Sequence, residues 1–323
     1  PIDSDGEHFS FLGDAIYSRL SGKLAKGLAR NWNGASLLDI GRSFLHASGH
    51  RAPRNPEMLV SLLMAGNVGR SWFSSSGQHW IEDFCGLLGS ASETFMADAY
   101  LAAKSPLMAI ARERNAPKTG TRGETPANFA MKTHARIFSI TRRSIISDDL
   151  TAFAQVLTEF GAAAAETEAR LLVDLLESNP VLADDKTALF HAKHGNDVSG
   201  ILAAANLEKA RLLLNLSPRY LVVPEALKDQ AENVLADIKA ATGNDWAQHV
   251  ELIAEPRLSR PADWYLFTDP NAAPVIECAW LNGIRQPTLM AQDGWNVAGT
   301  KFKARLDFGA GATGFRGAIR STG

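Results

Sequence analysis

The sequence predicts an α+β protein, and three observations lead to this prediction. Apolar residues recur at helical spacing in the N-terminal third, a single long helical pattern follows in the middle, and short strand patterns dominate the C-terminal third. The chain has 323 residues, which is enough for a sizeable core and for more than one domain.

The N-terminal region predicts a series of short helices. One apolar stripe runs at three- and four-residue steps from Phe9 to Leu28, and Ser36 is the expected N-cap of a second helix. Helical patterns also cover Glu57–Met64 and Trp80 to about Ala103, with a loop at Ser71–Gln78 between them.

Residues 112–143 predict a long hairpin with a flexible tip. The central stretch NAPKTGTRGETPAN contains two prolines, two glycines and no large apolar residue, so it cannot bury itself. The stretch KTHARIFSITRR that follows alternates as a strand does. We expect the tip to project into solvent or onto another chain.

Asp148–Ser178 gives the strongest single signal, an uninterrupted helical pattern. Ser147 is its expected N-cap, Asp148 and Asp149 lie in the first turn, where the helix dipole favours anions, and Pro180 ends it. Such a helix would be roughly 46 Å long. A helix of this length usually serves as a beam on which other elements pack.

The C-terminal region predicts strands around one amphipathic helix. The helix is EALKDQAENVLADIKAA, and no fixed-period repeat or low-complexity segment is present. The predicted strands lie in RYLVVP, HVELIAEP, DWYLFTD, VIECAWL, GWNVAGTKFKARLDFG and GFRGAIR.

Composition excludes several classes of protein. The formal net charge of −2 gives no reason to expect tight, nonspecific binding of nucleic acid. The apolar runs are too short for a membrane span, and the N-terminus has no basic region followed by an apolar one, as a signal peptide would. The two cysteines, Cys85 and Cys278, make no disulfide framework, which favours folding in a reducing cytosol.

The stretch HAKHGN, residues 191–196, raises the question of a metal site. His191 and His194 are spaced for one helix face, and Asp184 or Asp185 would supply a third ligand. However, the stretch ends in a Gly-Asn turn signature, and the HExxH pattern is absent. We therefore expect a turn whose imidazoles bond to the backbone, and no metal ligand.

Other catalytic patterns are weak. GAGATG, within Phe308–Gly317, matches GxGxxG by letters, but no helix follows it and the chain ends too soon for the acidic partner. A bend between two strands is the expectation. There is no GxSxG, and neither cysteine has a catalytic context. The sequence therefore predicts no enzyme, no catalytic residue and no cofactor.

Two neighbouring segments carry opposite charge. Residues 112–143 contain eight Lys and Arg against two Glu, a net charge of +6. The predicted long helix contains seven Asp and Glu against one Arg, a net charge of −6. The segments are expected to meet, either within one chain or between chains. The basic segment lacks interleaved aromatic residues that could stack on nucleic-acid bases.

The order of parts, together with several stretches of sequence, resembles the major capsid protein of tailed bacteriophages with the Hong Kong 97-like fold. The stretches are SLLDIGRSFL, RIFSITRRSIISDDLTAFAQ, ALFHAKHGN, PRYLVVPEAL, EPRL followed by WYLFTDP, and FKARLDFGAGATGFRG. They resemble the branch of that family in which the capsid protein is encoded as a fusion with a ClpP-like prohead protease. The resemblance runs from about Ser36 to the C-terminus.

The resemblance implies a division of the chain into the parts of that fold. Residues 1–106 would be a helical N-terminal arm or region, and residues 107–147 the E-loop hairpin. The spine helix and first part of the P domain would follow at 148–217, the A domain at 218–270, and the C-terminal strands of the P domain at 271–323. HAKHGN would be a structural turn after the spine helix.

The implied function is that of a major capsid protein that self-assembles into the icosahedral shell around the double-stranded DNA of a phage. Its partners would be copies of itself in hexamers and pentamers, the portal protein, the prohead protease and packaged DNA as enclosed content, with no membrane. Decoration proteins are left open. The protein would be assembled in the host cytoplasm and reside in the virion capsid, with cleavage just before Pro1 releasing it from the protease.

The charge pattern adds an assembly hypothesis of our own. We expect the basic hairpin of one subunit to dock, at least in part, on the acidic spine helix of a neighbour. The residues concerned are Arg112, Arg114, Lys118, Arg122, Arg142, Arg143, Asp148, Asp149, Glu159, Glu166 and Glu168. Lys118 is also the one candidate at the loop tip for a covalent crosslink, although no acceptor can be assigned.

Two alternatives remain at this stage. An encapsulin, a cellular nanocompartment of the same fold, would enclose a cargo enzyme instead of DNA. A metal-dependent hydrolase that uses His191, His194 and Asp184 or Asp185 is the alternative from another class.

Overall fold

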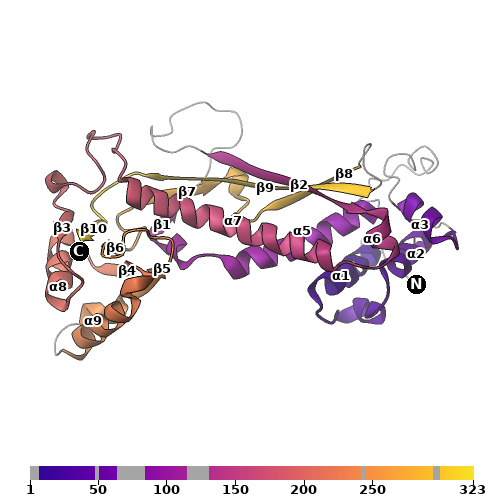
Figure 1. Ribbon diagram of the computed structural model, residues 1–323, viewed down its shortest axis with the longest axis horizontal. Coiled ribbons are helices and arrows are strands. Elements are labelled where there is room, and N and C mark those ends of the chain that lie inside the picture. Colours follow the sequence, from indigo (N-terminus) through magenta and orange to yellow (C-terminus); the bar gives the residue numbers. More distant parts are fainter. Residues whose placement is uncertain (1–6, 48–50, 64–83, 115–130, 242–244, 294–298) are drawn as a thin grey trace. The chain divides into compact units, whose positions relative to one another are not determined.

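The computed structural model describes residues 7–47, 51–63, 84–114, 131–241, 245–293 and 299–323 (Figure 1). The chain divides into two compact units. Unit 1 comprises residues 1–103, 133–164 and 286–306, and unit 2 comprises residues 104–132, 165–285 and 307–323. Helix α7 (Thr151–Ser178) and strand β9 (Gly299–Ala312) each contribute several residues to both units. In the described residues, no helix is long and apolar enough to cross a membrane.

Unit 1 contains the N-terminal helices, and α2 and α3 among them begin at capping residues. The Ser36 hydroxyl accepts a hydrogen bond from the Asp39 amide at 3.2 Å, and the Asp39 carboxylate accepts one from the Ser36 amide at 3.3 Å, which confirms Ser36 as an N-cap. Asn55 caps the next helix through the Glu57 amide at 2.8 Å. The helices of this part are α1 (Glu7–Ser21), η1 (Gly27–Trp32), α2 (Leu37–Ala47), α3 (Pro56–Leu63), α5 (Phe84–Ala103) and α6 (Arg142–Ile146).

The first helix is shorter than its apolar stripe predicted. Helix α1 ends at Ser21 because Gly22 has a φ of +67°, a left-handed conformation that glycine adopts readily at a helix end. Leu24 and Leu28, which the stripe placed on the buried face, are 80% and 70% exposed. The predicted loop at 71–78 and the start of the next helix at 80–83 lie outside the described residues.

The core of unit 1 joins helices to one face of a sheet. Strand β8 (Thr288–Asp293) pairs antiparallel with the first part of β9, and β9 also borders β2 (Lys132–Thr141). Phe138 of β2 stacks on Phe302 of β9, with ring centroids 5.4 Å apart, and Phe153 of α7 packs against both rings. Gly161 allows α7 to approach α5, because a Cβ there would lie 2.5 Å from the Met96 carbonyl oxygen.

Helix α7 begins later than predicted. Ser147 is the C-cap of α6, not the N-cap of the long helix, and Asp148 has a φ of +54° that interrupts the helical pattern. The Asp148 carboxylate forms an ion pair with Arg19 and accepts a hydrogen bond from the Leu37 amide at 2.9 Å. These contacts come from residues more than 100 positions away, so the local sequence gave no sign of them.

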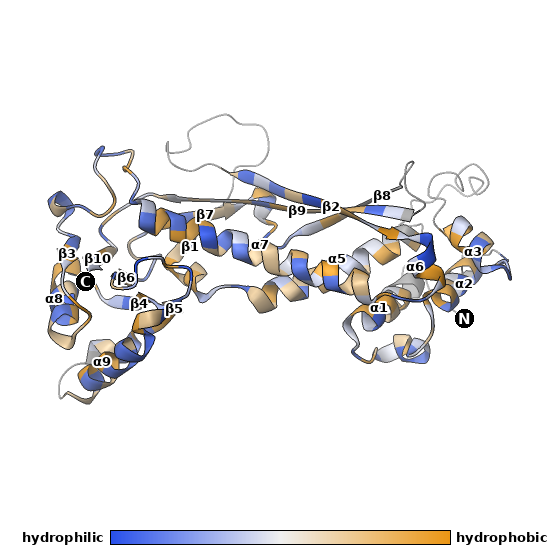
Figure 2. Cartoon of the chain, viewed as in Figure 1, coloured by the Kyte–Doolittle hydropathy of each residue, from blue (hydrophilic) through white to orange (hydrophobic). Residues whose placement is uncertain are grey.

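Unit 2 is built on a five-stranded sheet of order β3-β10-β6-β4-β5. Buried apolar strands and the amphipathic helix α9 form its core, and Figure 2 shows hydrophilic and hydrophobic residues mixed along α9. Strand β3 and helix α8 were not predicted. The elements are β3 (Asp197–Ser199), α8 (Ala204–Leu214), β4 (Pro218–Pro224), η5 (Glu225–Leu227), α9 (Lys228–Ala240), η6 (Asp245–His249), β5 (Glu251–Glu255), β6 (Trp264–Thr268) and β10 (Ala318–Thr322).

A second set of strands corrects the predicted hairpin at 112–143. Strand β1 (Ala111–Glu113), which follows η3 (Pro106–Ile110), pairs parallel with β7 (Ile276–Trp280), and β7 pairs antiparallel with β9. Because β7 and β9 stand between β1 and β2 in the sheet order, the two strands that flank residues 115–130 do not pair with each other. The predicted loop tip lies outside the described residues.

Candidate subunit-contact surface and the turn at residues 191–196

The predicted cations fall into two groups. Arg112 and Arg114 both bind the carboxylate of Glu277, whose side chain is only 4% exposed: Arg112 Nε lies 2.9 Å from Oε1 and Arg114 Nη1 lies 3.3 Å from Oε2. Arg142 and Arg143, at the start of α6, are exposed, and the Arg142 guanidinium donates to the Ser61 hydroxyl at 3.2 Å. Lys118 and Arg122 lie outside the described residues.

The acidic residues predicted to contact a neighbouring subunit also divide into a group paired within the chain and an exposed group. Glu168 is fully buried and its carboxylate accepts a hydrogen bond from Trp280 Nε1 at 2.7 Å. Glu166 binds Arg257 at 2.7 Å, and the hydrogen bond from that guanidinium lowers the pKa of Glu166. By contrast, Asp149 and Glu159 are exposed, and Glu159 accepts a hydrogen bond from Gln155 at 3.0 Å.

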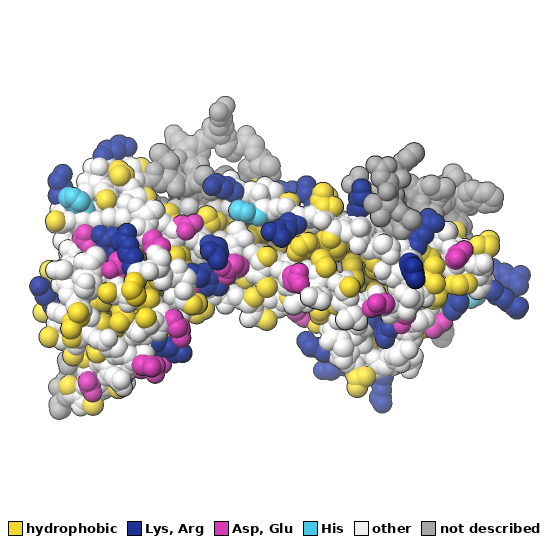
Figure 3. Space-filling view, viewed as in Figure 1, with side chains coloured by type: hydrophobic (Ala, Val, Ile, Leu, Met, Phe, Trp, Pro, Cys, Tyr) yellow, Lys and Arg dark blue, Asp and Glu magenta, His cyan; other side chains and the backbone are white. Residues whose placement is uncertain are grey.

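Many opposite charges therefore meet within the chain. On the face shown in Figure 3, Lys and Arg side chains are interspersed with Asp and Glu side chains. The buried Glu168 has no surface to offer a neighbour, and Arg112, Arg114, Asp148 and Glu166 already have partners in their own unit. The contact with a neighbouring subunit stays a prediction for the exposed residues Arg142, Arg143, Asp149 and Glu159.

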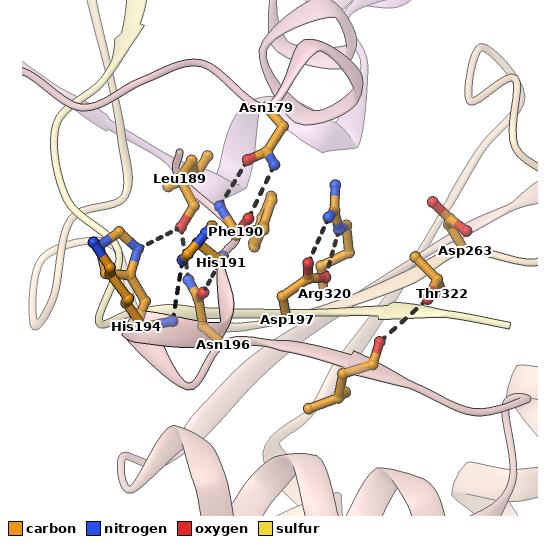
Figure 4. A network of polar contacts seen from close by, with 12 residues as sticks. Asn179, Leu189, Phe190, His191, His194, Asn196, Asp197, Asp263, Arg320 and Thr322 are labelled. Carbon is orange, nitrogen blue, oxygen red and sulfur yellow. Dashed lines mark hydrogen bonds and ion pairs between the residues drawn. The ribbon is translucent and has the colours of Figure 1, made fainter. Parts of the chain in front are cut away.

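The stretch HAKHGN forms a turn, as predicted. Residues Ala192–His194 make one turn of 3-10 helix, and Gly195 closes it with a φ of +67°. The buried Asn196 side chain accepts from the His191 amide at 3.0 Å and donates to the Leu189 carbonyl at 2.9 Å. Asn179 similarly holds the Phe190 backbone through its amide and carbonyl groups (Figure 4).

Nitrogen atoms of both histidine rings in this turn contact other groups of the protein. His194 Nε2 lies 2.6 Å from Asp185 Oδ2, and Nδ1 lies 3.1 Å from the Leu189 carbonyl oxygen. His191 Nδ1 accepts a hydrogen bond from the Lys193 amide at 3.1 Å. Among the described residues, no group of three or more His, Cys, Asp and Glu side chains is arranged to hold a metal ion. The geometry gives the hydrolase alternative no support.

The glycine-rich stretch 308–317 forms the end of β9 and the predicted bend before β10. Gly309, the last residue of the predicted strand, and Gly311 both lie within β9 and pair with residues of β7, so the strand continues to Ala312 and the bend comes later than predicted. A Cβ at Gly317 would lie 2.1 Å from the Ala273 carbonyl oxygen, which explains why glycine stands at this close approach of two backbone segments.

The sequence analysis did not identify Glu277 and Glu255, two buried acidic residues that pair with arginines. Glu277 stands alone in the apolar strand VIECAWL, and a single acid in a buried strand is itself a sign of a cationic partner. Glu255 is similar: it is buried at the end of β5, binds Arg257 at 2.6 Å and accepts from the Ser105 hydroxyl at 2.9 Å.

Comparison with known proteins places the chain in a family. Residues 124–321, more than half of the sequence, match the phage capsid protein family. No curated protein matches. Similar solved structures include the capsid of cyanophage P-SCSP1u (11% identity, TM-score 0.46, 68% of this chain and 86% of that chain covered) and the capsid of Ralstonia phage GP4 (9%, 0.46, 68% and 90%). A virus-like particle from Pyrococcus furiosus is also similar (10%, 0.44, 72% and 98%).

The chain thus belongs to the phage capsid protein family, a class of structural proteins and not of enzymes. It is a major capsid protein, which assembles with copies of itself into an icosahedral shell and resides in the virion capsid. The predicted α+β, Hong Kong 97-like fold class is confirmed by this membership.

Proposed function

We propose that neighbouring subunits of the shell are held together in part by a charge contact between α6 of one copy and the start of α7 of the next. Arg142 and Arg143 carry this proposal. They are exposed side by side, and in the described part of the chain no carboxylate lies within ion-pair distance of either. Asp149 and Glu159 offer exposed carboxylates for a neighbour's arginines.

One such contact contributes little free energy, but the many copies of the contact in a shell contribute a substantial total. An exposed ion pair contributes only about 0–1 kcal/mol, and salt screens it further. Because each contact is heterologous in a closed ring of subunits, every copy contributes it once as donor and once as acceptor. Weak repeated contacts also allow a misplaced subunit to dissociate before the shell closes.

Charge reversal tests the proposal. The double variant Arg142→Glu/Arg143→Glu is expected to fold as the wild type does but to lose shell yield, measured by sedimentation and negative-stain electron microscopy at low and moderate salt. Adding Glu159→Lys should restore part of that yield. Lys23→Glu/Lys26→Glu, which reverses two exposed cations elsewhere in unit 1, is the matched control. Shells of normal yield and salt tolerance from the first variant would refute the contact.

The roles of the remaining parts are proposed from the resemblance of the sequence. Residues 107–147 would be the E-loop that reaches across an adjacent subunit, 148–217 the spine helix and first part of the P domain, 218–270 the A domain, and 271–323 the last strands of the P domain. Strands β4, β5 and β6 with helix α9 support a separate α/β element at 218–270. A density map of assembled shells would show which parts of the chain lie at the symmetry axes.

The processing branch and the further partners are also proposals. The quoted stretches support membership of the branch that is fused to a prohead protease, and with it the protease, the portal protein and packaged double-stranded DNA as partners. The test is the intact mass of the capsid protein from virions. A mass that still includes a prohead protease would count against release of the capsid protein from such a fusion.

A further inference from the structure

A ridge of exposed leucines lies on the outer side of helix α8 in unit 2. Leu212 and Leu213, near the end of the helix, are 63% and 46% exposed, and Leu216, just beyond it, is 41% exposed. The other side of α8, with Leu207 and Leu214, is buried in the core of unit 2. Single exposed apolar residues are common, but several gathered in one place are typical of a contact with another protein chain.

A groove with an apolar floor lies in the same unit, between α9 and strand β5. Its volume is about 470 Å³. Strand β5 is the last strand in the order β3-β10-β6-β4-β5, so the groove runs along an edge of the described sheet. The apolar lining residues are Leu235, Ala236, Val250, Leu252 and Ala254, and the charged ones, all exposed, are Lys228, Glu232 and Lys239.

The leucine ridge and the groove lie on opposite sides of unit 2. Helices α8 and α9 pack on the same face of the sheet, α8 over β10 and β6 and α9 over β4 and β5. Gln230 of α9 points toward the start of α8, because its Nε2 lies 2.5 Å from the Leu202 carbonyl oxygen. Glu232 lines the groove and, two residues further along a helix of 3.6 residues per turn, points the opposite way. The ridge therefore cannot reach the groove of its own chain.

The two surfaces also carry complementary charges. Lys209 stands on the outer side of α8, one turn before the ridge, and Glu232 stands in the groove. Within the described residues, neither side chain lies within ion-pair distance of an opposite charge, whereas the neighbouring cations Arg211 and Lys228 already have carboxylate partners. Lys239, the other lysine of the groove, stands two turns of α9 away from Glu232.

We propose that the leucine ridge of one subunit docks into the groove of a second copy, with Lys209 opposite Glu232. A second copy is the partner because this chain assembles with copies of itself. Each copy offers its ridge to one neighbour and its groove to another, which is a heterologous contact that can close into a ring. Burial of the leucines drives the contact, and the ion pair fixes its register. The contact is separate from that of Arg142 and Arg143, which lie in unit 1.

Substitutions on each surface of the full chain test the proposal. Leu212→Gln/Leu213→Gln makes the ridge polar, and Ala236→Gln fills the groove. Each should raise the subunit concentration at which shells form by roughly tenfold or more, measured by sedimentation and negative-stain electron microscopy. Because the substituted residues are exposed, urea unfolding of the unassembled subunits should match that of the wild type.

Two matched controls accompany these variants. Leu24→Gln/Leu28→Gln changes two exposed leucines of unit 1, and Ala240→Gln changes an exposed residue of α9 that does not line the groove. Both should assemble at the wild-type concentration. Normal assembly of the ridge variant would overturn the proposal. Impaired assembly of the groove variant alone would also overturn it, because the groove would then hold something other than the ridge of a second copy.

Chemical crosslinking identifies the partner directly. Shells of the double variant Leu213→Cys/Ala236→Cys, treated with a short bifunctional thiol reagent, should give a ladder of covalent multimers on a denaturing gel. Shells assembled from a mixture of the two single variants should stop at dimers, because each chain then carries one end of the contact. The wild-type chain is the control for its own cysteines. Dimers from Leu213→Cys alone, or no ladder from the double variant, would overturn the head-to-tail contact.

Discussion

Two pairs of arginines, one before and one after residues 115–130, look alike in the sequence and differ in the structure. Arg112 and Arg114 close on the buried carboxylate of Glu277, which is the partner of Arg112 in the parallel pairing of β1 with β7. Arg142 and Arg143 begin a short helix and remain exposed. Equal contributions to net charge therefore stand in different surroundings, one pair bound to a buried acid and the other exposed.

The difference shows that a net charge counted from the sequence does not tell which charged side chains are paired with a buried group and which are exposed. A buried carboxylate must have partners, because an isolated charge in a low-dielectric interior is strongly disfavoured. Arg112 and Arg114 therefore stabilise the pairing of β1 with β7. An exposed cation is hydrated and keeps its freedom to meet another molecule. The first pair stabilises the fold, and a role of the second pair in assembly is our proposal.

The largest expected effect follows from removing the shared acid. Glu277→Gln leaves two arginines without their counter-charge, and should lower the free energy of unfolding by about 3 kcal/mol, the lower end of the range for breaking a buried pair because both arginines are partly exposed. Urea unfolding of unassembled subunits measures it. Glu251→Gln, at an exposed glutamate of strand β5, is the control and should change little. Equal losses would show that Glu277 is not a buried ion-pair partner.

A smaller change in the free energy of unfolding is expected when one arginine of each pair is substituted and the two variants are compared. Arg112→Gln leaves Glu277 with Arg114 alone and should cost about 1–2 kcal/mol, since a hydrogen bond to a charged group is lost. Arg142→Gln loses one exposed bond to Ser61 and should stay within about 0.5 kcal/mol of the wild type. Midpoints of urea unfolding measure this difference, and a larger loss for Arg142→Gln would reverse the division of roles.

Much of the fold followed from local patterns. The apolar runs of β4, β6 and β7 and the amphipathic α9 appear where the sequence predicted them, because burial of one face dictates the residue pattern. The three-residue strand β3 was missed, since it is too short to show alternation. The late start of α7 was missed because contacts from Arg19 and Leu37 stabilise the positive φ of Asp148.

The contact residues were harder to predict than the fold. Their chemistry depends on which charges the chain brings together, and pairs such as Glu277 with Arg112 lie 165 positions apart in the sequence. The turn at 191–196 was predictable as a turn from its Gly-Asn ending. The groups that contact the two histidine rings became evident only with the positions of Asp185, Leu189 and Lys193.

The last prediction concerns an ion pair that is neither buried nor fully exposed. Glu166 is 37% exposed and binds Arg257, whose hydrogen bond holds the pKa of the Glu166 carboxyl below its usual range. A carboxyl with a lower pKa in the folded protein stabilises it above the pKa of the unfolded chain, and this stabilisation is lost as pH falls through the folded-state pKa. Acidification should therefore weaken this contact.

The variant Glu166→Gln removes this contact together with the ion pair to Arg170. Its free energy of unfolding should fall below that of the wild type by less than about 1 kcal/mol at neutral pH, because solvent screens a partly exposed pair. The difference should vanish in acid, where the wild-type carboxyl is protonated, and shrink in high salt. Urea unfolding at several pH values measures it. A difference that is the same at every pH would mean that Glu166 acts through the packing of its side-chain stem and not through its charge.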